Sequence, residues 1–140
     1  MSDLVLRSAE AHDVPAVLAF WRGAADDAHR PVDTAAGLAT LHLRDPHALI
    51  LAVDGNDIVG TIIAGWDGWR CHIYRLAVAP ARRRAGIGRM LLAAAEERFR
   101  ILGGGRVDAM VLDDNERAHG LWRASGYRRQ AEWSRWIKPL

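Results

Sequence analysis

A strand pattern through the middle of the chain constrains the fold more than any other feature. Residues 48–53 are a continuous apolar run of strand length, and the Asp-Gly-Asn-Asp sequence at 54–57 is a strong hairpin turn. Residues 58–64 return as a second strand, an Asp-Gly turn follows at 67–68, and residues 71–78 form a third strand. This succession predicts a three-stranded antiparallel meander.

Helical spacing of apolar residues precedes the meander. A short first strand over residues 4–6 leads to a helix at about 14–21, which Asp13 can cap. A second helix is expected near residues 34–43, and Pro46 ends it.

A strand-helix-strand crossover follows the meander. A long helix is expected over 87–102, where Gly103 begins a run of glycines that stops it, and a buried strand over 107–112. Asp113 or Asp114 can cap a further helix, and 127–137 alternates like a last strand. The expected order is β-α-α-β-β-β-α-β-α-β, an α/β fold with a mixed sheet whose crossover is parallel and right-handed.

Size and charge narrow the function. A chain of 140 residues has room for one core, so we expect a single domain over 1–140. Its one cysteine, Cys71, excludes an internal disulfide and a multi-cysteine zinc site, and we expect no metal cofactor. With no long apolar segment and a free thiol, we expect a cytoplasmic protein. The net charge of +2 argues against a dedicated nucleic-acid binder.

The segment between the third strand and the long helix carries the clearest chemistry. An arginine cluster at 82–84 is followed by Gly86 and Gly88, which open the helix. Main-chain N–H groups at a helix start bind anions, and arginines add charge-assisted bonds, so the pattern favours a diphosphate. A dinucleotide fingerprint would need a third glycine where Leu91 stands, and a Walker loop would need Gly-Lys-Ser/Thr. The alternative is a helix start with solvated arginines.

Several motifs together resemble the GNAT family of N-acetyltransferases. Residues 83–88 match its Arg/Gln-x-x-Gly-x-Gly/Ala motif, and residues 76–80 extend the match as Leu-Ala-Val-x-Pro. Residues 115–127 are similar to the family's Asn-x-x-Ala-x-x-Phe-Tyr-x-x-x-Gly-Phe ending, and 65–70 to a hairpin of small bacterial members. Spacing and element order agree over about residues 3–137. The resemblance implies the acyl-CoA N-acyltransferase fold and transfer of an acetyl group from acetyl-CoA to a primary amine of a small molecule, peptide or protein.

The resemblance also implies the residues that hold the cosubstrate. Main-chain N–H groups of about 84–89 would bind the pyrophosphate, and Arg83 or Arg84 the adenosine end. The pantetheine arm would pair with the strand at Leu76 and Val78, where that strand parts from the one near Val107. An N–H near Leu76 would polarise the thioester carbonyl. The implied cofactor-binding residues are Leu76, Ala77, Val78, Arg83, Arg84, Ala85, Gly86, Ile87, Gly88, Arg89 and Asn115, although Asn115 could instead serve only as a turn or cap residue.

Three residues are candidates for the chemical step. His72 stands where some family members place a base for the amine proton, although a strand histidine is often structural. Tyr74 shares its face in a regular strand and could order a water. Trp122 replaces the tyrosine that usually protonates the leaving thiolate, and an indole is not a useful acid. The thiolate could instead leave unassisted, Tyr127 or water could serve, or Trp122 could simply pack the helix.

The acceptor and partners are less constrained. The tryptophans could line an acceptor pocket, with Trp66 and Trp69 flanking a turn at its mouth or at a dimer contact, but most are expected in the core or at edges. Asp26, Asp27 and Asp33 could hold a cation or form a solvated loop. A homodimer through the terminal strand is possible. The alternatives to an enzyme are a CoA-binding module with little turnover and a nucleic-acid binder using the arginine cluster.

Overall fold

The computed structural model describes residues 3–24 and 29–140 of the chain. The chain forms two compact units, Met1–Met110 and Val111–Leu140. The first unit holds the sheet and three helices, and the second holds one helix and the C-terminal segment.

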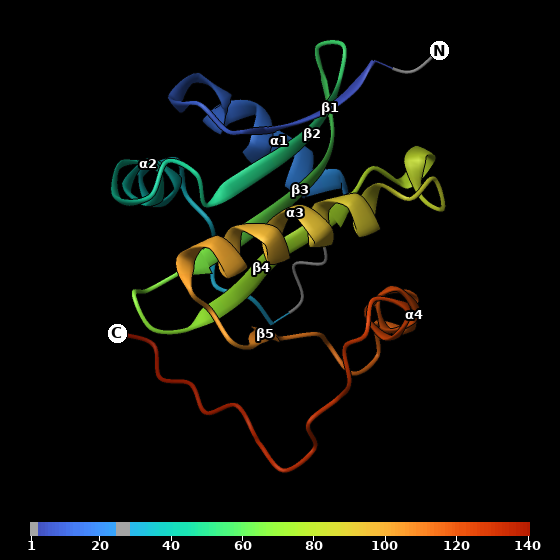
Figure 1. Ribbon diagram of the computed structural model, residues 1–140. Coiled ribbons are helices and arrows are strands. Elements are labelled where there is room, and N and C mark those ends of the chain that lie inside the picture. Colours follow the sequence, from blue (N-terminus) through green and yellow to red (C-terminus); the bar gives the residue numbers. More distant parts are fainter. Residues whose placement is uncertain (1–2, 25–28) are drawn as a thin grey trace. The chain divides into compact units, whose positions relative to one another are not determined.

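A five-stranded sheet, in the order β1-β2-β3-β4-β5, forms the centre of the first unit (Figure 1). The first four strands are antiparallel neighbours, and β5 runs parallel to β4. The strands are β1 Leu4–Ser8, β2 Leu49–Asp54, β3 Asp57–Trp66, β4 Cys71–Val78 and β5 Val107–Ala109. The expected meander is therefore confirmed, with a parallel crossover to β5.

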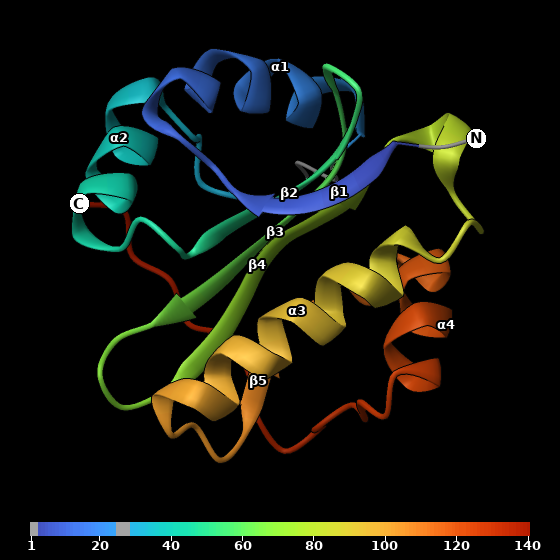
Figure 2. The ribbon, with the colours of Figure 1, turned by 45° about the horizontal axis from the view of Figure 1, so that its top comes forward.

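Helices cover both faces of this sheet (Figure 2). Helices α1 (Val14–Ala24) and α2 (Ala35–Arg44) lie on one face, and the longer α3 (Ile87–Leu102) lies on the other. Short 3-10 turns, η1 (Ala11–Asp13) and η2 (Pro80–Arg82), come before α1 and after β4. We call the two sides of the sheet the α1 face and the α3 face.

Apolar side chains fill the space on both faces. On the α1 face, Val17, Trp21 and Leu38 pack against strand residues such as Leu51 and Ile63. On the α3 face the sheet has a glycine under the start of α3. A Cβ on Gly60 would lie 2.9 Å from side-chain atoms of both Ile87 and Leu91. The missing side chain lets the first turns of α3 sit directly on the sheet.

Asp13 joins the first strand to the first helix. Its carboxylate accepts hydrogen bonds from both terminal nitrogens of Arg7, at 2.7 and 3.0 Å, and from the main-chain N–H of Glu10 at 2.7 Å. The bond from Arg7 is the main cause that lowers the pKa of Asp13 from 3.8 to about 2. A depressed carboxyl pKa stabilises the fold above pH 3.8, and this stabilisation is lost as the pH falls towards 2.

We therefore expect Asp13→Asn to lower the free energy of unfolding at pH 7 by about 2 kcal/mol. The deficit should shrink as the pH falls from 4 to 2, because wild-type Asp13 is then protonated as well. Urea denaturation across this range measures it. The matched control is Asp108→Asn, which breaks the more exposed pair with Arg106 and should cost less than about 1 kcal/mol. A deficit for Asp13→Asn that is independent of pH would contradict this assignment.

The second unit contains α4 (Glu116–Ala124) and an extended C-terminal segment. Asn115 caps the helix, since its side-chain oxygen accepts a hydrogen bond from the N–H of Ala118 at 3.3 Å. The expectation that Asp113 or Asp114 would be the cap is therefore wrong. Asn115 is the residue whose side chain reaches the third residue of the helix.

The last strand predicted over 127–137 is also wrong, because the structure assigns no strand there. Residues 128–140 are exposed throughout, including Trp133, Trp136 and Ile137. An alternating pattern becomes a strand only where a neighbouring edge supplies main-chain hydrogen bonds. The described segment has no recorded ladder partner.

The remaining elements lie where the sequence predicts them, except that β5 ends at Ala109 instead of reaching residue 112. Among the described residues, no helix is both long and apolar enough to cross a membrane.

Candidate active site on β4 and the start of α3

Strand β4 contains a bulge that changes which side chains share a face. Its Cys71 faces α3, because a Cβ on Gly104 after that helix would lie 2.2 Å from the Cys71 Sγ. Tyr74 lies on the α1 face beside Gly65, and Arg75 also lies there, with its guanidinium 4.8 Å from the Trp21 ring centroid. Successive residues of a regular strand face opposite sides, so Tyr74 and Arg75 break the alternation.

The pairing of β4 with β3 confirms the irregularity. The register shifts between Thr61 and Ile63, whose partners are Ala77 and Tyr74. Arg75 has φ 52°, a left-handed conformation that is uncommon for a residue with a side chain. From Leu76 on, alternation resumes with Ala77 in the α1-face core, which leaves Leu76 and Val78 towards the α3 face.

The two candidate residues His72 and Tyr74 lie together on the α1 face. Their ring centroids are 6.2 Å apart, His72 is half-buried, and Tyr74 is 49% exposed. Gly65 makes room for the phenol, because a Cβ there would lie 3.1 Å from the Tyr74 ring. The sequence prediction that these two residues share a face is confirmed, and both are accessible to a ligand.

A carboxylate lies beside His72 on the neighbouring strand. Asp108 of β5 is the register partner of His72 and accepts two hydrogen bonds from Arg106, at 2.8 and 2.9 Å. The bond from Arg106 is the main cause that lowers the pKa of Asp108, and a smaller contribution comes from His72. The α1 face of this edge therefore presents an imidazole, a phenol and an ionised carboxylate.

The second half of β4 is not covered by β5. Pairing of the two strands is recorded from Cys71 and Val107 to Ile73 and Ala109, where β5 ends, whereas β4 continues to Val78. The ladder between β4 and β5 thus ends before Leu76, as expected if the two strands part. Among the described residues, the pairing with β5 does not reach Leu76, Ala77 and Val78, where an extended amide-bearing chain could pair.

The start of α3 lies shortly after this strand. Gly86 is its N-cap with φ 84°, and nothing lies within 4 Å of the position that a Cβ would take. The first N–H groups of a helix have no partner within the helix, so those of Gly86, Ile87, Gly88 and Arg89 present positive partial charge. These positions form the helix start that the motif at 83–88 predicts.

The arginines before α3 differ in what they contact. Arg82 forms an ion pair with Asp54, the last residue of β2, at 2.9 Å, and Arg83 donates to the carbonyl of Ala24 at 3.4 Å. Arg84 is exposed and has φ 67°, and Ala85 after it is exposed as well. Only part of the cluster is thus solvated, and Arg82 is engaged in holding the loop.

Asn115 and Trp122 belong to the second unit. The side-chain oxygen of Asn115 caps α4, so the structure describes Asn115 in the capping role that was the alternative to cofactor binding. The side-chain NH₂ group of Asn115 is a separate hydrogen-bond donor. Trp122 is 9% exposed and packs edge-on against Tyr127, with ring centroids 4.8 Å apart. Their roles towards a cosubstrate stay predictions.

The expectations for the acceptor side are met only in part. Trp21 is a core residue, Trp66 is half-buried, and Trp69 is 72% exposed with Arg70 stacked on its ring. Asp26 and Asp27 lie outside the described residues. Asp33 lies in an exposed loop, as one of the two alternatives has it, and its carboxylate forms an ion pair with the buried Arg75.

Arg75 is the residue that sequence reasoning missed. It is 8% exposed, and it contacts Asp33, Trp21 and Thr61. The sequence does contain a sign of this role. Arg75 stands in the middle of the strand, and the alternate positions around it, such as Cys71 and Ala77, are apolar. A charged residue at a core position of a strand indicates a buried partner.

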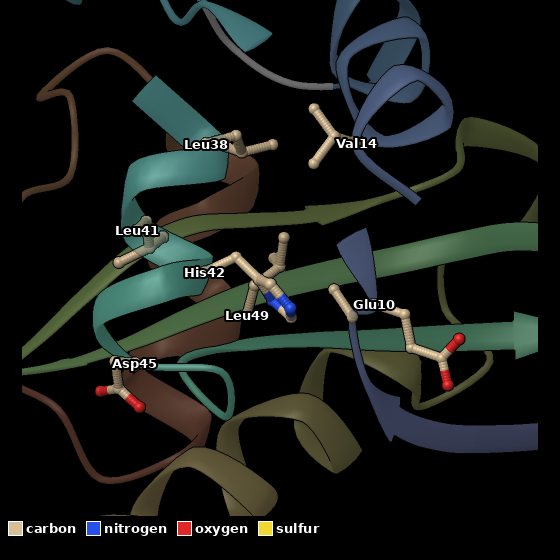
Figure 3. A pocket seen from close by; sticks show the side chains of 8 residues that line it. Glu10, Val14, Leu38, Leu41, His42, Asp45 and Leu49 are labelled. Atoms are coloured by element: carbon tan, nitrogen blue, oxygen red, sulfur yellow. The ribbon is translucent and has the colours of Figure 1, made fainter. Parts of the chain in front are cut away.

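A cavity in the first unit is too small to hold a ligand. A small apolar cavity lies between α2 and the start of α1, where Leu38 points towards Val14 and His42 and Glu10 lie at its edge (Figure 3). Its volume of about 10 Å³ is at most that of one water. Across residues 3–24 and 29–140, no three histidine, cysteine or acidic side chains are grouped as metal ligands.

A family model supplies the observation that decides the relationship. The model for the acetyltransferase (GNAT) family matches residues 15–127. The chain belongs to the GNAT family. This match includes β4, the start of α3 and α4, so each motif quoted above lies inside it.

Two curated relatives of this GNAT protein come from bacteria. An acetyltransferase of Pectobacterium atrosepticum is 31% identical over 83 residues, which cover 59% of each chain. An acetyltransferase of Yersinia pestis is 30% identical over 86 residues, or 61% of each chain. The matched part therefore spans about three fifths of the length of these relatives.

Solved structures of low identity share the fold. Ard1 from Thermoplasma volcanium superposes with a TM-score of 0.78 at 22% identity, covering 91% of this chain and 84% of that one. The PaiA N-acetyltransferase of Thermoplasma acidophilum, solved with coenzyme A, gives 0.78 at 14% identity and covers 91% of each chain. These likenesses confirm the predicted acyl-CoA N-acyltransferase fold.

Proposed function

We propose that this GNAT protein transfers the acetyl group of acetyl-CoA to a primary amine. The observation that carries the proposal is the arrangement of β4 and α3. Strand β4, whose pairing with β5 ends at Ile73, is followed by a helix start whose N-cap, Gly86, is left-handed and open. The first feature suits the amide-bearing pantetheine arm and the second suits a diphosphate. Coenzyme A contains both, joined in that order.

Each group of the site has a part in this reaction. The N–H groups from Arg84 to Arg89 hold the pyrophosphate, with Arg83 or Arg84 near the adenosine end. The main chain of Leu76, Ala77 and Val78 pairs with pantetheine, and Asn115 donates to it. An N–H near Leu76 stabilises negative charge on the thioester oxygen as the amine attacks.

Three proton transfers complete the chemistry. His72 removes a proton from the ammonium of the acceptor, directly or through a water that Tyr74 orders, so that a neutral amine attacks. The amine nitrogen then forms the C–N bond, the C–S bond breaks, the electron pair leaves with sulfur, and the nitrogen gives up its second proton to water. The thiolate takes a proton from water or Tyr127, because Trp122 offers only a hydrogen bond.

The amine is a small molecule, a peptide or a protein side chain. One structural neighbour is AAC(6')-Iy in complex with a bisubstrate analogue of CoA and acetylneamine, with a TM-score of 0.79 at 15% identity. This neighbour supports testing aminoglycosides among the acceptors. The fold by itself does not fix the acceptor.

The test is a panel of amines with detection of the released thiol. Acetyl-CoA is supplied with neamine, spermidine, a peptide with a free N-terminus and a lysine peptide whose N-terminus is blocked. Release of CoA above the amine-free rate with any of them supports the proposal. A protein whose melting temperature acetyl-CoA does not raise, and which releases no thiol, is not this enzyme.

A second candidate function is a CoA-binding module with little turnover, which Trp122 at the family's tyrosine position favours. We expect Trp122→Tyr to give equal or higher turnover, with the affinity for CoA changed little. Trp122→Phe is the matched control: it keeps the packing on Tyr127, removes the indole N–H, and should cost at most about 1–2 kcal/mol. Stabilisation by CoA without thiol release in wild type and in Trp122→Tyr would favour the binding module.

Location and partners complete the proposal. A cytoplasmic enzyme would meet acetyl-CoA there, and the buried thiol of Cys71 persists in a reducing compartment. Salt-sensitive retention on DNA without stabilisation by CoA would instead indicate a nucleic-acid binder. Light scattering across a concentration series tests the possible homodimer.

A further inference from the structure

Arg75 is a buried cation that the proposed reaction does not use. The nitrogen Nε donates to the carboxylate of Asp33 at 2.7 Å, and a terminal nitrogen donates to the same oxygen. The face of the guanidinium rests 4.8 Å from the ring centroid of Trp21 in α1. A charge removed from water destabilises the fold unless it is paired, so these contacts are needed for Arg75 to be buried.

The main chain of Arg75 is held as firmly as its side chain. Its carbonyl accepts a hydrogen bond from the Thr61 hydroxyl at 2.8 Å, and that hydroxyl accepts one from the indole N–H of Trp21 at 2.9 Å. Thr61 and Trp21 are both buried. We call Arg75, Asp33, Trp21 and Thr61 the bulge clamp.

The clamp lies at the residue that makes the bulge. A left-handed φ at a residue with a side chain costs on the order of 1 kcal/mol or more, and it persists only where its surroundings hold it. Without the clamp, Arg75 would relax towards regular strand geometry. Relaxation by one residue moves every later side chain of the strand to the other face, so Leu76 would join the face of His72 and Tyr74.

We infer that Arg75 is a positioning residue, which acts through the bulge clamp to fix the main chain between Tyr74 and Leu76 for acetyl transfer. The inference rests on the proposed function, because that function places the reacting thioester at this point of β4. Asp33 has a part in it as well: it ties the segment before α2 to the bulge. Neither residue needs to contact the substrates.

The test neutralises the carboxylate and leaves Arg75 in place. Asp33→Asn is compared with Asp45→Asn, which neutralises the partner of a second arginine, the half-buried Arg98. Arg98 donates to both oxygens of Asp45 at 2.6 Å and joins α3 to the end of α2, away from the bulge. Each variant loses one ion pair between an arginine that is less than a fifth exposed and a more exposed carboxylate.

Two measurements separate positioning from stability. Hydrogen exchange followed by mass spectrometry reports the main chain of residues 72–78. Acetohydroxamate formed from acetyl-CoA and hydroxylamine reports activation of the thioester, because hydroxylamine is too small to need an acceptor pocket. For Asp33→Asn we expect exchange over 72–78 to rise at least tenfold and kcat to fall between about tenfold and a hundredfold. The KM for acetyl-CoA should change much less than kcat, since the helix start that holds the pyrophosphate is untouched.

Asp45→Asn should lower the melting temperature without changing the exchange of residues 72–78 or kcat by more than about twofold. Arg75→Met and the double variant Arg75→Met/Asp33→Asn should both resemble Asp33→Asn, because residues acting as one unit are not additive. Equal effects of Asp33→Asn and Asp45→Asn on exchange and kcat would overturn the inference. If wild type neither gains stability from CoA nor releases thiol, the proposed function has failed, and unequal exchange in the two variants would still identify the clamp.

Discussion

The Gly86→Asp variant is expected to lose stabilisation by CoA while the apoprotein stays folded. An aspartate side chain meets nothing within 4 Å at this position, so the fold has room for it. The left-handed φ of 84° costs about 1–2 kcal/mol for a residue with a side chain. The added carboxylate occupies the helix start where the pyrophosphate is proposed to bind, and two like charges there repel each other.

The measurement is the melting temperature with and without CoA. At a concentration about a hundredfold above Kd, CoA should stabilise wild type by about 3 kcal/mol and Gly86→Asp by almost nothing. Gly103→Asp is the matched control, because Gly103 ends the same helix with φ 92° and equally open surroundings. That variant should be destabilised at least as much and keep its response to CoA. A full response in Gly86→Asp would rule out the helix start as the phosphate site.

His72→Ala is expected to lower kcat by roughly a hundredfold if His72 removes the amine proton. The side chain lies on the accessible α1 face beside Tyr74 and opposite Asp108 on β5, so its loss leaves the sheet intact. The affinity for acetyl-CoA should change little, because the helix start is separate from His72. Rates with the most active amine of the panel measure the effect, and added imidazole should restore part of the lost rate.

Two variants control this experiment. His47→Ala removes an exposed histidine that hydrogen-bonds Ser8 of β1, at the edge of the sheet opposite β5, and should leave kcat unchanged. Tyr74→Phe keeps the ring beside Gly65 and removes only the hydroxyl. A silent His72→Ala together with a severe loss in Tyr74→Phe would assign the proton transfer to Tyr74.

Local patterns in the sequence predicted most of the elements around the site. The third strand of the meander was expected over 71–78 and the long helix over 87–102, and β4 and α3 have these bounds. Both elements are predicted by features close to them in the sequence. These are the regular spacing of apolar residues, the turn before the strand, and the glycines at each end of the helix. The helix start at Gly86 is local in the same way, because glycine readily adopts the left-handed φ of this N-cap.

The sequence was less informative where a second part of the chain decides the outcome. Residues 127–137 alternate like a strand, yet alternation does not supply the neighbouring edge that a strand needs, and no strand forms. The choice of Asn115 over Asp113 or Asp114 as cap depends on which residue first adopts the geometry of the helix start.

The sequence by itself determined the meander, the crossover helix and the glycine-opened helix start. Only the tertiary structure decided that Tyr74 and Arg75 share one face of β4, and that Arg75 is paired with Asp33. The physical reason is distance along the chain. The bulge exists because Trp21, Asp33 and Thr61, from three separate segments, meet one strained residue, and no pattern within the strand contains that information.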